Sequence, residues 1–404
     1  MAGPLAGFRV LDLSRILAGP WASQMLADLG AEVIKVERPG SGDDTRGWGP
    51  PYMPDEDGRP TTESAYFHGA NRGKRSVCID MSRAEGQSLL RELARHCDVL
   101  IENFKVGGLQ KYALDYDSLK PINPALVYCS ITGFGQTGPY AERAGYDFMI
   151  QAMGGMMSVT GEADGQPMKI GVALADVLTG LYAANAIQAA LIHQRASGEG
   201  QYIDMALLDV QVATLANQAM NYLASGDSPG RMGNAHPNIV PYQAFQTDDG
   251  HIILAIGNDA QFERFCELAG RRELAEDERF RKNSDRVKHR LELIPQIADL
   301  MLQKSSAQWL EALNAKGIPC GPINNIGEVF GDPQVKFRGL RLELEHPLAG
   351  SVASVANPIR LSRTPIEYRQ GPPLLGQHTD EVLGRLLSLD ATALTQLRAE
   401  GIIA

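Results

Sequence analysis

An alternation of β-rich and helical patterns in the first 130 residues constrains the fold more than any other feature of the sequence. FRVLDLS (residues 8–14) and AEVIKVE (31–37) are β-rich, and GPWASQMLADLG (19–30) between them has helical spacing and a stop at Gly30. The pattern recurs in SVCID (76–80), a helical segment opened by Ser82, DVLIENF (98–104) and ALVYCSITGF (125–134). It predicts an α/β fold whose parallel sheet, Rossmann-like in its βαβ units, carries helices on both faces.

The later sequence indicates a second domain and a return to the first. A long helix ends near RASGEG (195–200), and a strand QYIDMA (201–206) and a helix from Leu207 to about Leu223 follow it. A stretch rich in Gly, Pro, Ser and Asn (225–241) then precedes a hairpin that turns at Asp249 and Gly250. Short strands such as PIRLS (358–362) and one last helix, TDEVLGRLLSL (379–389), end the chain. We predict a large domain over 1–224, a smaller α+β domain over 225–330, and a C-terminal part, 331–404, that returns to the large domain.

Composition and charge exclude several classes of protein. The formal net charge of the 404 residues is -10 and no long basic block occurs, which argues against nucleic acid as a partner. Five scattered cysteines without a CxxC pair predict neither a disulfide framework nor a metal site. The N-terminus does not resemble a signal peptide, and the longest apolar stretch contains Thr179, Asn185 and Gln188, which is typical of a buried helix. We expect a cytoplasmic protein with no membrane partner.

Two phosphate-loop patterns lack the context that their chemistry needs. Gly133, Gly135 and Gly138 spell GxGxxG after a strand, but Pro139 follows and no helix begins there. GANRGKRS (69–76) is one residue short of a P-loop and has Arg75 where a hydroxyl should bind magnesium, so we predict a turn that enters a strand. The sequence has no HExxH.

Asp176, in KIGVALADVLTGLYAANAI (169–187), is a lone acid at the start of an apolar helix. The ordinary interpretation is a helix N-cap. The second interpretation is a nucleophile, because a helix N-terminus favours the ionised carboxylate. The small residues Ala173, Ala175 and Gly180 would let a bulky ligand approach. The two interpretations are compatible, and the residues alone leave both open.

Several long motifs in order resemble the class III CoA-transferase family, of the CaiB/BaiF type, which includes formyl-CoA transferase and carnitine CoA-transferases. They are RVLDLSRILAGPWASQMLADLGAEVIKVERPGSGDDTR, IENFKVGGLQKYALDY, GYDFMIQAMGGMMSVTG, SGEGQYIDMALLD, GIPCGPI and LLGQHTDEVL. The resemblance covers almost the whole chain. It implies a two-domain α/β protomer and a homodimer whose protomers interlock.

The resemblance also implies the chemistry. The catalytic aspartate of the family falls on Asp176, which attacks an acyl-CoA to form an aspartyl anhydride and then an aspartyl-CoA thioester. An acceptor acid takes the CoA through a second anhydride. CoA esters are co-substrates, and no metal or permanently bound cofactor takes part.

The same resemblance assigns binding residues. Leu17 and Ala18 would lie near the thioester, Arg38 beside the adenine and phosphates, and Asn103, Phe104 and Lys105 along the nucleotide groove. Lys111 stands where many members have Arg, so it keeps a phosphate-binding charge without the bidentate fork. The glycine loop of the family looks like AIGNDAQF (255–262), which predicts a lid role for Gly257 and Asn258.

Tyr146, in AGYDFM, separates transfer from an alternative reaction. The related α-methylacyl-CoA racemases carry a histidine in this segment to move the α-proton, and a tyrosine favours transfer. A core tyrosine that caps the site is its ordinary interpretation. A further alternative, a non-catalytic acyl-CoA binding protein, would not need Asp176.

The acceptor acid is predicted less directly. AHPNIVPYQAFQTDDGHIILAIGND (235–259) looks most like transferases that use succinyl-CoA and dicarboxylates such as glutarate or hydroxymethylglutarate. A dicarboxylate needs a cation or strong donor at its far end. The candidates for this pocket are Arg46, Trp48, His236 and Asn238.

Overall fold

The computed structural model describes residues 3–404, which form two compact units. The first comprises the chain up to Met156, Ile170–Ala219 and Gln334–Ala404, and the second comprises Met157–Lys169 and Met220–Pro333. The chain therefore leaves the first unit twice and returns to it twice. The predicted large domain, 1–224, instead includes residues 157–169.

A six-stranded parallel sheet forms the centre of the first unit, as the sequence predicts. Its order is β5 (Lys74–Cys78), β2 (Glu32–Glu37), β1 (Arg9–Asp12), β6 (Val99–Glu102), β7 (Val127–Thr132) and β8 (Tyr202–Ala206). All five neighbouring pairs are parallel. The strand order runs outward in both directions from β1 and β6, so the chain reverses its direction of progress between these two strands. Ligands of open α/β sheets bind beyond the carboxyl ends of the strands at such a point.

Alternate residues of each strand feed two separate cores. Val10, Val99 and Val127 pack with α1 (Ala18–Asp28), α5 (Asp147–Met153) and α7 (Leu174–Ser197). Leu11 and Leu100 point the other way, into a core shared with α3 (Ala84–Arg95), α17 (Thr379–Leu387) and α18 (Ala391–Ala399). Successive side chains of a strand point to opposite faces of the sheet. Because both faces are covered here, successive residues such as Val10 and Leu11 are apolar and the strands appear in the sequence as continuous apolar runs.

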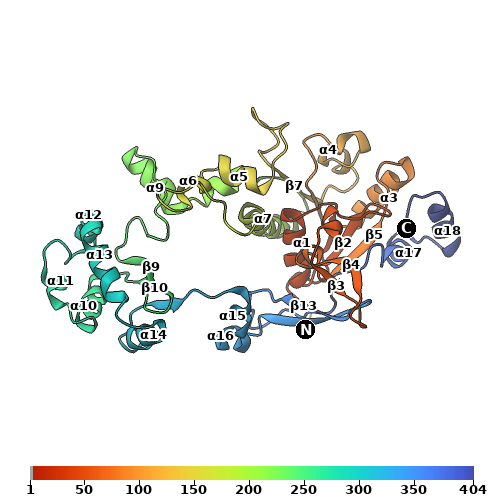
Figure 1. Ribbon diagram of the computed structural model, residues 1–404. Helices are drawn as coiled ribbons and strands as arrows, with labels where there is room; N and C mark the ends of the chain where they lie inside the picture. The colour runs from red at the N-terminus through yellow and green to blue at the C-terminus, as the bar shows by residue number, and fades with distance from the viewer. Residues whose placement is uncertain (1–2) are drawn as a thin grey trace. The chain divides into compact units, whose positions relative to one another are not determined.

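The C-terminal return contributes helices but no strand to this sheet. Figure 1 shows α17 beside β5, and the N–H of Cys78 donates to Thr379 Oγ1 over 3.1 Å. Ile403 adds only an isolated bridge to Ile79. The predicted strand PIRLS is wrong, because residues 358–362 form no strand; the strands of this part are the hairpin β12 (Arg341–His346) and β13 (Gly350–Val355). The last predicted helix is present as α17, but α18 follows it.

Two helix boundaries also differ from the prediction. The helix α3 begins after Arg83, and the Ser82 hydroxyl instead donates to Asp80 over 2.7 Å. The helix predicted from Leu207 to Leu223 is broken into α8 (Leu207–Ala213) and α9 (Ala216–Ser225), with Ala216 in the left-handed region. The GxGxxG segment enters no helix and GANRGKRS turns into β5, as predicted.

Close contact between α7 and α1 depends on one glycine. A Cβ on Gly180 would lie 2.8 Å from the Ala18 carbonyl oxygen and 2.9 Å from Trp21 Cβ. Gly180 therefore serves helix packing and not the approach of a ligand, which corrects the sequence interpretation. The helix α7 is long and apolar enough to cross a membrane by length and composition. Its buried residues, including Ala183, Ala184 and Ile187, instead form part of the core of the first unit.

The second unit has its own core around the predicted hairpin. Strands β9 (Tyr242–Gln246) and β10 (His251–Ala255) pair antiparallel around the turn, and β11 (Cys320–Pro322) adds to β10. Phe262, Phe265 and Trp309 are buried between this sheet and the helices α10 (Asp259–Leu268), α13 (Arg290–Met301) and α14 (Ser306–Ala315). The remaining elements are η1 (Asp44–Gly47), β3 (Tyr52–Pro54), β4 (Pro60–Ser64), α2 (Ala65–His68), η2 (Gln110–Tyr112), α4 (Tyr116–Leu119), α6 (Met156–Val159), α11 (Arg272–Glu276), α12 (Asn283–Lys288), α15 (Ile326–Gly331) and α16 (Pro333–Phe337).

Candidate active site

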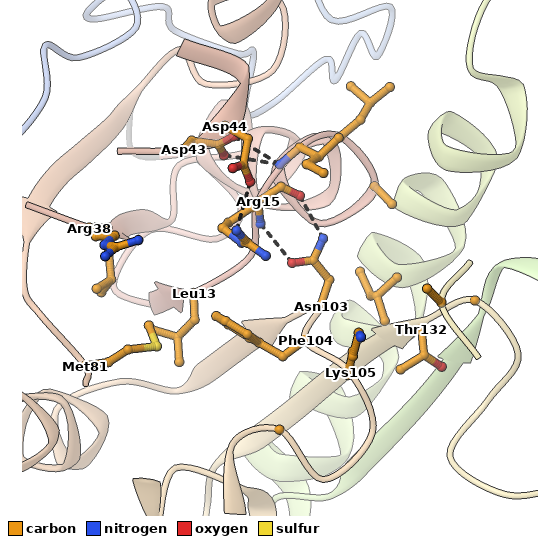
Figure 2. A pocket seen from close by; sticks show the side chains of 18 of the residues that line it. Leu13, Arg15, Arg38, Asp43, Asp44, Met81, Asn103, Phe104, Lys105 and Thr132 are labelled. Carbon is orange, nitrogen blue, oxygen red and sulfur yellow. Dashed lines mark hydrogen bonds and ion pairs between the residues drawn. The ribbon is translucent and has the colours of Figure 1, made fainter. Parts of the chain in front are cut away.

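A cavity of about 710 Å³ opens beyond the carboxyl ends of five strands in the first unit. The segments that follow β1, β2, β5, β6 and β7 each contribute to its wall, and Figure 2 shows Leu13, Arg38, Met81, Phe104 and Thr132 from these segments. The N-termini of α1 and α7 also reach the cavity, through Ala18 and Asp176. The topology of the sheet thus brings together residues that lie far apart in the sequence.

The predicted CoA-binding residues and the predicted nucleophile all line this one cavity. They are Leu17, Ala18, Arg38, Asn103, Phe104, Lys105, Lys111, Tyr146 and Asp176. Their roles in binding remain predictions. Tyr146 is 64% exposed at the wall, so the interpretation as a core tyrosine is wrong.

The loop between β1 and α1 is held in an unusual conformation. Ile16 has a φ of 72°, in the left-handed region that a β-branched residue rarely adopts. Its N–H lies 3.2 Å from both carboxylate oxygens of Asp43. Asn103 exchanges two hydrogen bonds with the backbone of Arg15, at 2.9 and 2.7 Å, as Figure 2 shows. Asn103 therefore shapes the wall of the cavity from which Leu17 and Ala18 project.

Buried ion pairs support the same loop. Lys35 is fully buried and donates to Asp43 over 2.8 Å and to the Ser14 carbonyl oxygen over 3.0 Å. Burial alone would raise the pKa of Asp43, but the Lys35 charge and hydrogen bonds lower it to about 2. Lys74 makes a similar buried pair with Asp12, at 3.2 Å. Because an unpaired buried charge is costly, these pairs fix the loop in a single arrangement.

Four cations on the cavity wall are available to a ligand. Within residues 3–404, Arg38, Lys105, Lys111 and Arg143 form no ion pair, whereas Arg15 is paired with Asp44 at 2.8 Å. They make a local positive patch in a chain whose net charge is -10. Clustered Arg and Lys side chains of this kind bind phosphate groups. Arg143 was not among the predicted residues, because nothing in its sequence context distinguishes it from a surface cation.

Asp176 occupies the first turn of α7 but is not its N-cap. The N-cap is Ala173, whose side chain cannot accept a hydrogen bond, so the ordinary interpretation of Asp176 is wrong. Burial raises the pKa of Asp176 to about 7, and the charge of Asp147 contributes to the increase. The helix N-terminus therefore does not keep this carboxylate at an ordinary pKa. A carboxylate with a raised pKa in a cavity is a common mark of catalytic chemistry.

Tyr66, which was not among the predicted residues, lies near Asp176 and packs on Trp48, which was. Burial is the larger cause of the raised pKa of Tyr66, and the charge of Asp176 adds to it. The Tyr66 ring packs edge-on against Trp48, with centroids 5.1 Å apart. Trp48 is 44% exposed but does not line the cavity.

Arg46 is not available to read a substrate carboxylate. Its Nε and one terminal nitrogen donate to the two Glu37 oxygens, each over 2.7 Å, and it lies over the Phe67 ring at 3.7 Å. It also lies 3.6 Å from Glu63. The prediction that Arg46 lines the substrate pocket is therefore corrected: the side chain is a buried structural link.

The other predicted substrate residues belong to the second unit. The His236 ring packs on Tyr242 at 5.3 Å, and its Nδ1 accepts from the N–H of Asn238 over 3.0 Å. Asn258 caps α10, and the N–H of Gly257 donates to Gln261 over 2.7 Å. These contacts order the segment, and the proposed lid and substrate roles stay predictions.

One group of buried side chains could in principle hold a metal. Glu63, His68 and His346 offer ligand atoms within 4.8 Å of one another. However, the backbone N–H groups of Leu348 and Ala349 point at Nδ1 of His346, at 3.4 and 3.3 Å. Nδ1 is then the acceptor, and the proton lies on Nε2, where a metal would have to bind. This tautomer argues against a metal at these residues.

The sequence profile of CoA-transferase family III matches residues 5–379. The chain belongs to CoA-transferase family III. It is thus an enzyme of the CoA-transferase class, which uses CoA thioesters as co-substrates.

Relatives and solved structures agree with the family assignment. The chain is 56% identical to a succinate–glutarate CoA-transferase of Agrobacterium fabrum, over 96% of this chain and 97% of the relative. It is 44% identical to a human succinyl-CoA:glutarate CoA-transferase, over 99% of this chain and 90% of the relative. A crystal structure of a CaiB/BaiF family protein from Brucella suis superposes with a TM-score of 0.84 at 54% identity, covering 96% of this chain and 100% of that one.

Proposed function

We propose that this family III enzyme transfers CoA from succinyl-CoA to a dicarboxylic acid of the glutarate class. The support comes from the activities named for its relatives, at 56% and 44% identity over nearly the full length. Three of the four unpaired cations of the cavity, Arg38, Lys105 and Lys111, match the phosphate groups of CoA. Asp176 opens onto the same cavity, so a nucleophile and a nucleotide site share one space.

The proposed reaction passes through four acyl exchanges at Asp176. Its carboxylate attacks the succinyl thioester carbonyl and expels CoA thiolate, which gives an aspartyl–succinyl anhydride. The thiolate then attacks the aspartyl carbonyl and releases succinate, leaving an aspartyl-CoA thioester. Glutarate attacks this thioester and expels the thiolate to give a second anhydride. The thiolate attacks the glutaryl carbonyl, which forms glutaryl-CoA and regenerates the Asp176 carboxylate.

The observation that carries this mechanism is the position and pKa of Asp176. Only the ionised carboxylate can attack, and a pKa near 7 makes it more basic, and thus more nucleophilic, than an ordinary aspartate. In this proposal the backbone N–H groups of Leu17 and Ala18, which line the cavity at the start of α1, stabilise the developing oxyanion, as helix N-termini do.

The carboxylate of glutarate that does not react should be bound by a donor other than Arg46. Arg143 is the cation we favour, because it lines the cavity, has no ion pair within the described chain and is held over Tyr140 at 4.6 Å. Its exchange for leucine should raise KM for glutarate more than KM for succinyl-CoA. A larger effect on succinyl-CoA would assign Arg143 to the CoA phosphates instead.

We also propose that the enzyme is a homodimer. Support comes from apolar side chains exposed on the first unit, among them Ile192 at 73%, Val212 at 50% and Phe337 at 87%. Single exposed apolar residues are ordinary, but many on one unit indicate a buried interface. Sedimentation at nanomolar concentration should give a dimer, and a stable folded monomer there would contradict it.

One experiment tests the proposed reaction directly. Purified enzyme is incubated with succinyl-CoA and either glutarate, hydroxymethylglutarate or oxalate, and CoA esters are followed by mass spectrometry. We expect glutaryl-CoA and succinate in equal amounts, and a hydroxamate on the Asp176 peptide when hydroxylamine is added. Asp176→Asn should abolish both products while the protein stays folded. Exchange of solvent deuterium into the α-carbon of a substrate, without an acceptor acid, would favour a racemase.

A further inference from the structure

The first turn of α7 lacks a cap of its own, and a neighbouring helix supplies one. Ala173 offers no side-chain acceptor, and the N–H of Ala175, one residue before Asp176, donates to Asp147 Oδ1 over 2.9 Å. Asp147 is the first residue of α5, which packs beside α7 (Figure 1). The carboxylate thus satisfies one of the orphan amides of another helix.

Gln151 extends this contact by one turn of α5. Its Nε2 donates to Asp147 Oδ2 over 2.8 Å, and its Oε1 accepts from the N–H of Ile170 over 2.9 Å. The side chain is fully buried, at 0% exposure, and Nε2 also lies 3.5 Å from the Val172 carbonyl oxygen. The Ile170 N–H needs an acceptor and the Asp147 carboxylate needs a donor. These two partners therefore fix the orientation of the Gln151 amide, with Oε1 toward Ile170 and Nε2 toward Asp147.

The clamp formed by Asp147 and Gln151 lies at a boundary of the fold. Met157–Lys169 belong to the second unit, and the first unit resumes at Ile170. The clamp therefore fastens the six residues that lead from this boundary to Asp176. Segments with few buried contacts open more easily than cores, so a nucleophile that follows such a boundary needs a fastening of this kind.

We propose that Asp147 is a positioning residue for the reaction, which holds the start of α7, and Asp176 with it, through the clamp that it forms with Gln151. This inference rests on the proposed function of Asp176. Reactions between groups held at the right distance lose roughly 100-fold in rate when one group is misplaced by about 1 Å. A loosened first turn would therefore lower kcat and spare the binding of CoA.

The charge of Asp147 provides a second readout, which a merely structural role would not give. Burial raises the pKa of Asp176 first, and Asp147 is the charge that adds to this increase. The neighbouring elements also carry ionisable groups: Tyr66 on α2, Tyr146 before α5, Asp209 on α8, Asp204 on β8, and Asp28 on α1, which is paired with Arg72. None of these adds to the pKa of Asp176. The decrease of kcat at low pH, which follows protonation of Asp176, should therefore respond to Asp147 in particular.

Three variants separate geometry from charge. Asp147→Ala removes both the cap and the charge. Asp147→Asn keeps an oxygen for Ala175 but removes the charge and the acceptor of Gln151 Nε2, so its comparison with Gln151→Leu, which loses the same bond and keeps the charge, isolates the charge. Gln151→Leu breaks the link to Ile170 and keeps the charge. Glu142→Gln is the matched control, because it removes an exposed negative charge five residues away that does not line the cavity.

The first measurement does not depend on activity. Hydrogen exchange of the peptide that spans residues 170–176 should be at least about tenfold faster in Asp147→Ala and Gln151→Leu than in wild type, and unchanged in Glu142→Gln. Equal protection in all four proteins would overturn the proposal, whether or not the enzyme transfers CoA to glutarate.

The second measurement uses steady-state kinetics across pH with succinyl-CoA and glutarate. Asp147→Ala should lower kcat roughly 10- to 100-fold with KM for succinyl-CoA unchanged. Asp147→Asn should move the acid limb of kcat to lower pH by about one unit, and Gln151→Leu should lower kcat without moving it. If these variants have the kcat and the pH profile of the wild type, the positioning role is refuted. A wild type without transfer would refute the proposed function instead, and the exchange result would still stand.

Discussion

Gly180→Ala should loosen the contact that sets α7 against α1. The added methyl group would meet the Ala18 carbonyl oxygen at 2.8 Å and Trp21 Cβ at 2.9 Å. A carbonyl oxygen in a helix cannot rotate away, so the two helices must separate by several tenths of an ångström. Both helices begin at the cavity, and the change therefore moves Asp176 relative to Ala18.

The size of the effect follows from two opposing terms. Overpacking of a well-packed contact costs about 1–3 kcal/mol, and the rigid backbone contact places this case near the upper end. Alanine gains about 1 kcal/mol over glycine in helix propensity. The local stability of the helix pair should therefore fall by about 2 kcal/mol, which corresponds to hydrogen exchange roughly 30-fold faster.

Hydrogen exchange by mass spectrometry measures this change, with Gly384→Ala as the matched control. Gly384 also lies in a helix of the first unit, α17, and its nearest added contact is an ordinary 3.5 Å. Gly384→Ala should slow exchange in α17, whereas Gly180→Ala should speed it in α1 and α7 and lower kcat. If Gly180→Ala protects α7 as well as the parent does, the close packing of the two helices does not limit the structure as we argue.

Four further outcomes are expected. The kcat of the wild type should fall as pH drops through about 7, because protonation removes the attacking carboxylate of Asp176, whose pKa burial raises; a flat profile between pH 5 and 8 would contradict this. At pH 8, Asp176→Asn should melt at or above the wild-type temperature, because ionisation is unfavourable for a carboxyl group whose pKa folding has raised. Arg46→Met should destabilise the fold by about 3 kcal/mol, measured by thermal melting, since it leaves Glu37 buried with fewer partners, and should not alter the KM for glutarate. Arg38→Ala should raise KM for succinyl-CoA at least about tenfold with little change in kcat, and Arg83→Ala, outside the cavity, should change neither.

The parallel sheet could be predicted from the sequence because each strand is buried on both faces, which leaves continuous apolar runs such as those around Val10 and Val127. The same reasoning failed for PIRLS, because a short apolar run has no partner strand that the sequence can reveal. The cavity was predicted only through resemblance. Burial of Lys35 with Asp43, and of Arg46 with Glu37, depends on three-dimensional pairing, and either cation alone reads as a ligand-binding or surface residue.

The role of Asp147 was missed for a related reason. Its partner Ala175 is 28 residues away, and a cap supplied from another helix leaves no local signature. Local capping patterns predict a helix start only when the acceptor is in the same segment. A first turn without a Ser, Thr, Asp or Asn at its N-cap, as at Ala173, is the one sign that an outside acceptor is needed.

The late arrival of the C-terminal helices has a consequence for biosynthesis. One face of the central sheet is covered partly by Val382, Leu383 and Leu394, and roughly 300 residues separate Ile79 at the end of β5 from these side chains. Ribosomes add about 5–20 residues per second, so this face stays uncovered for roughly 15–60 s after β5 is made. We expect the nascent chain to depend on a chaperone during this interval, and premature termination before α17 to yield aggregates instead of a truncated enzyme.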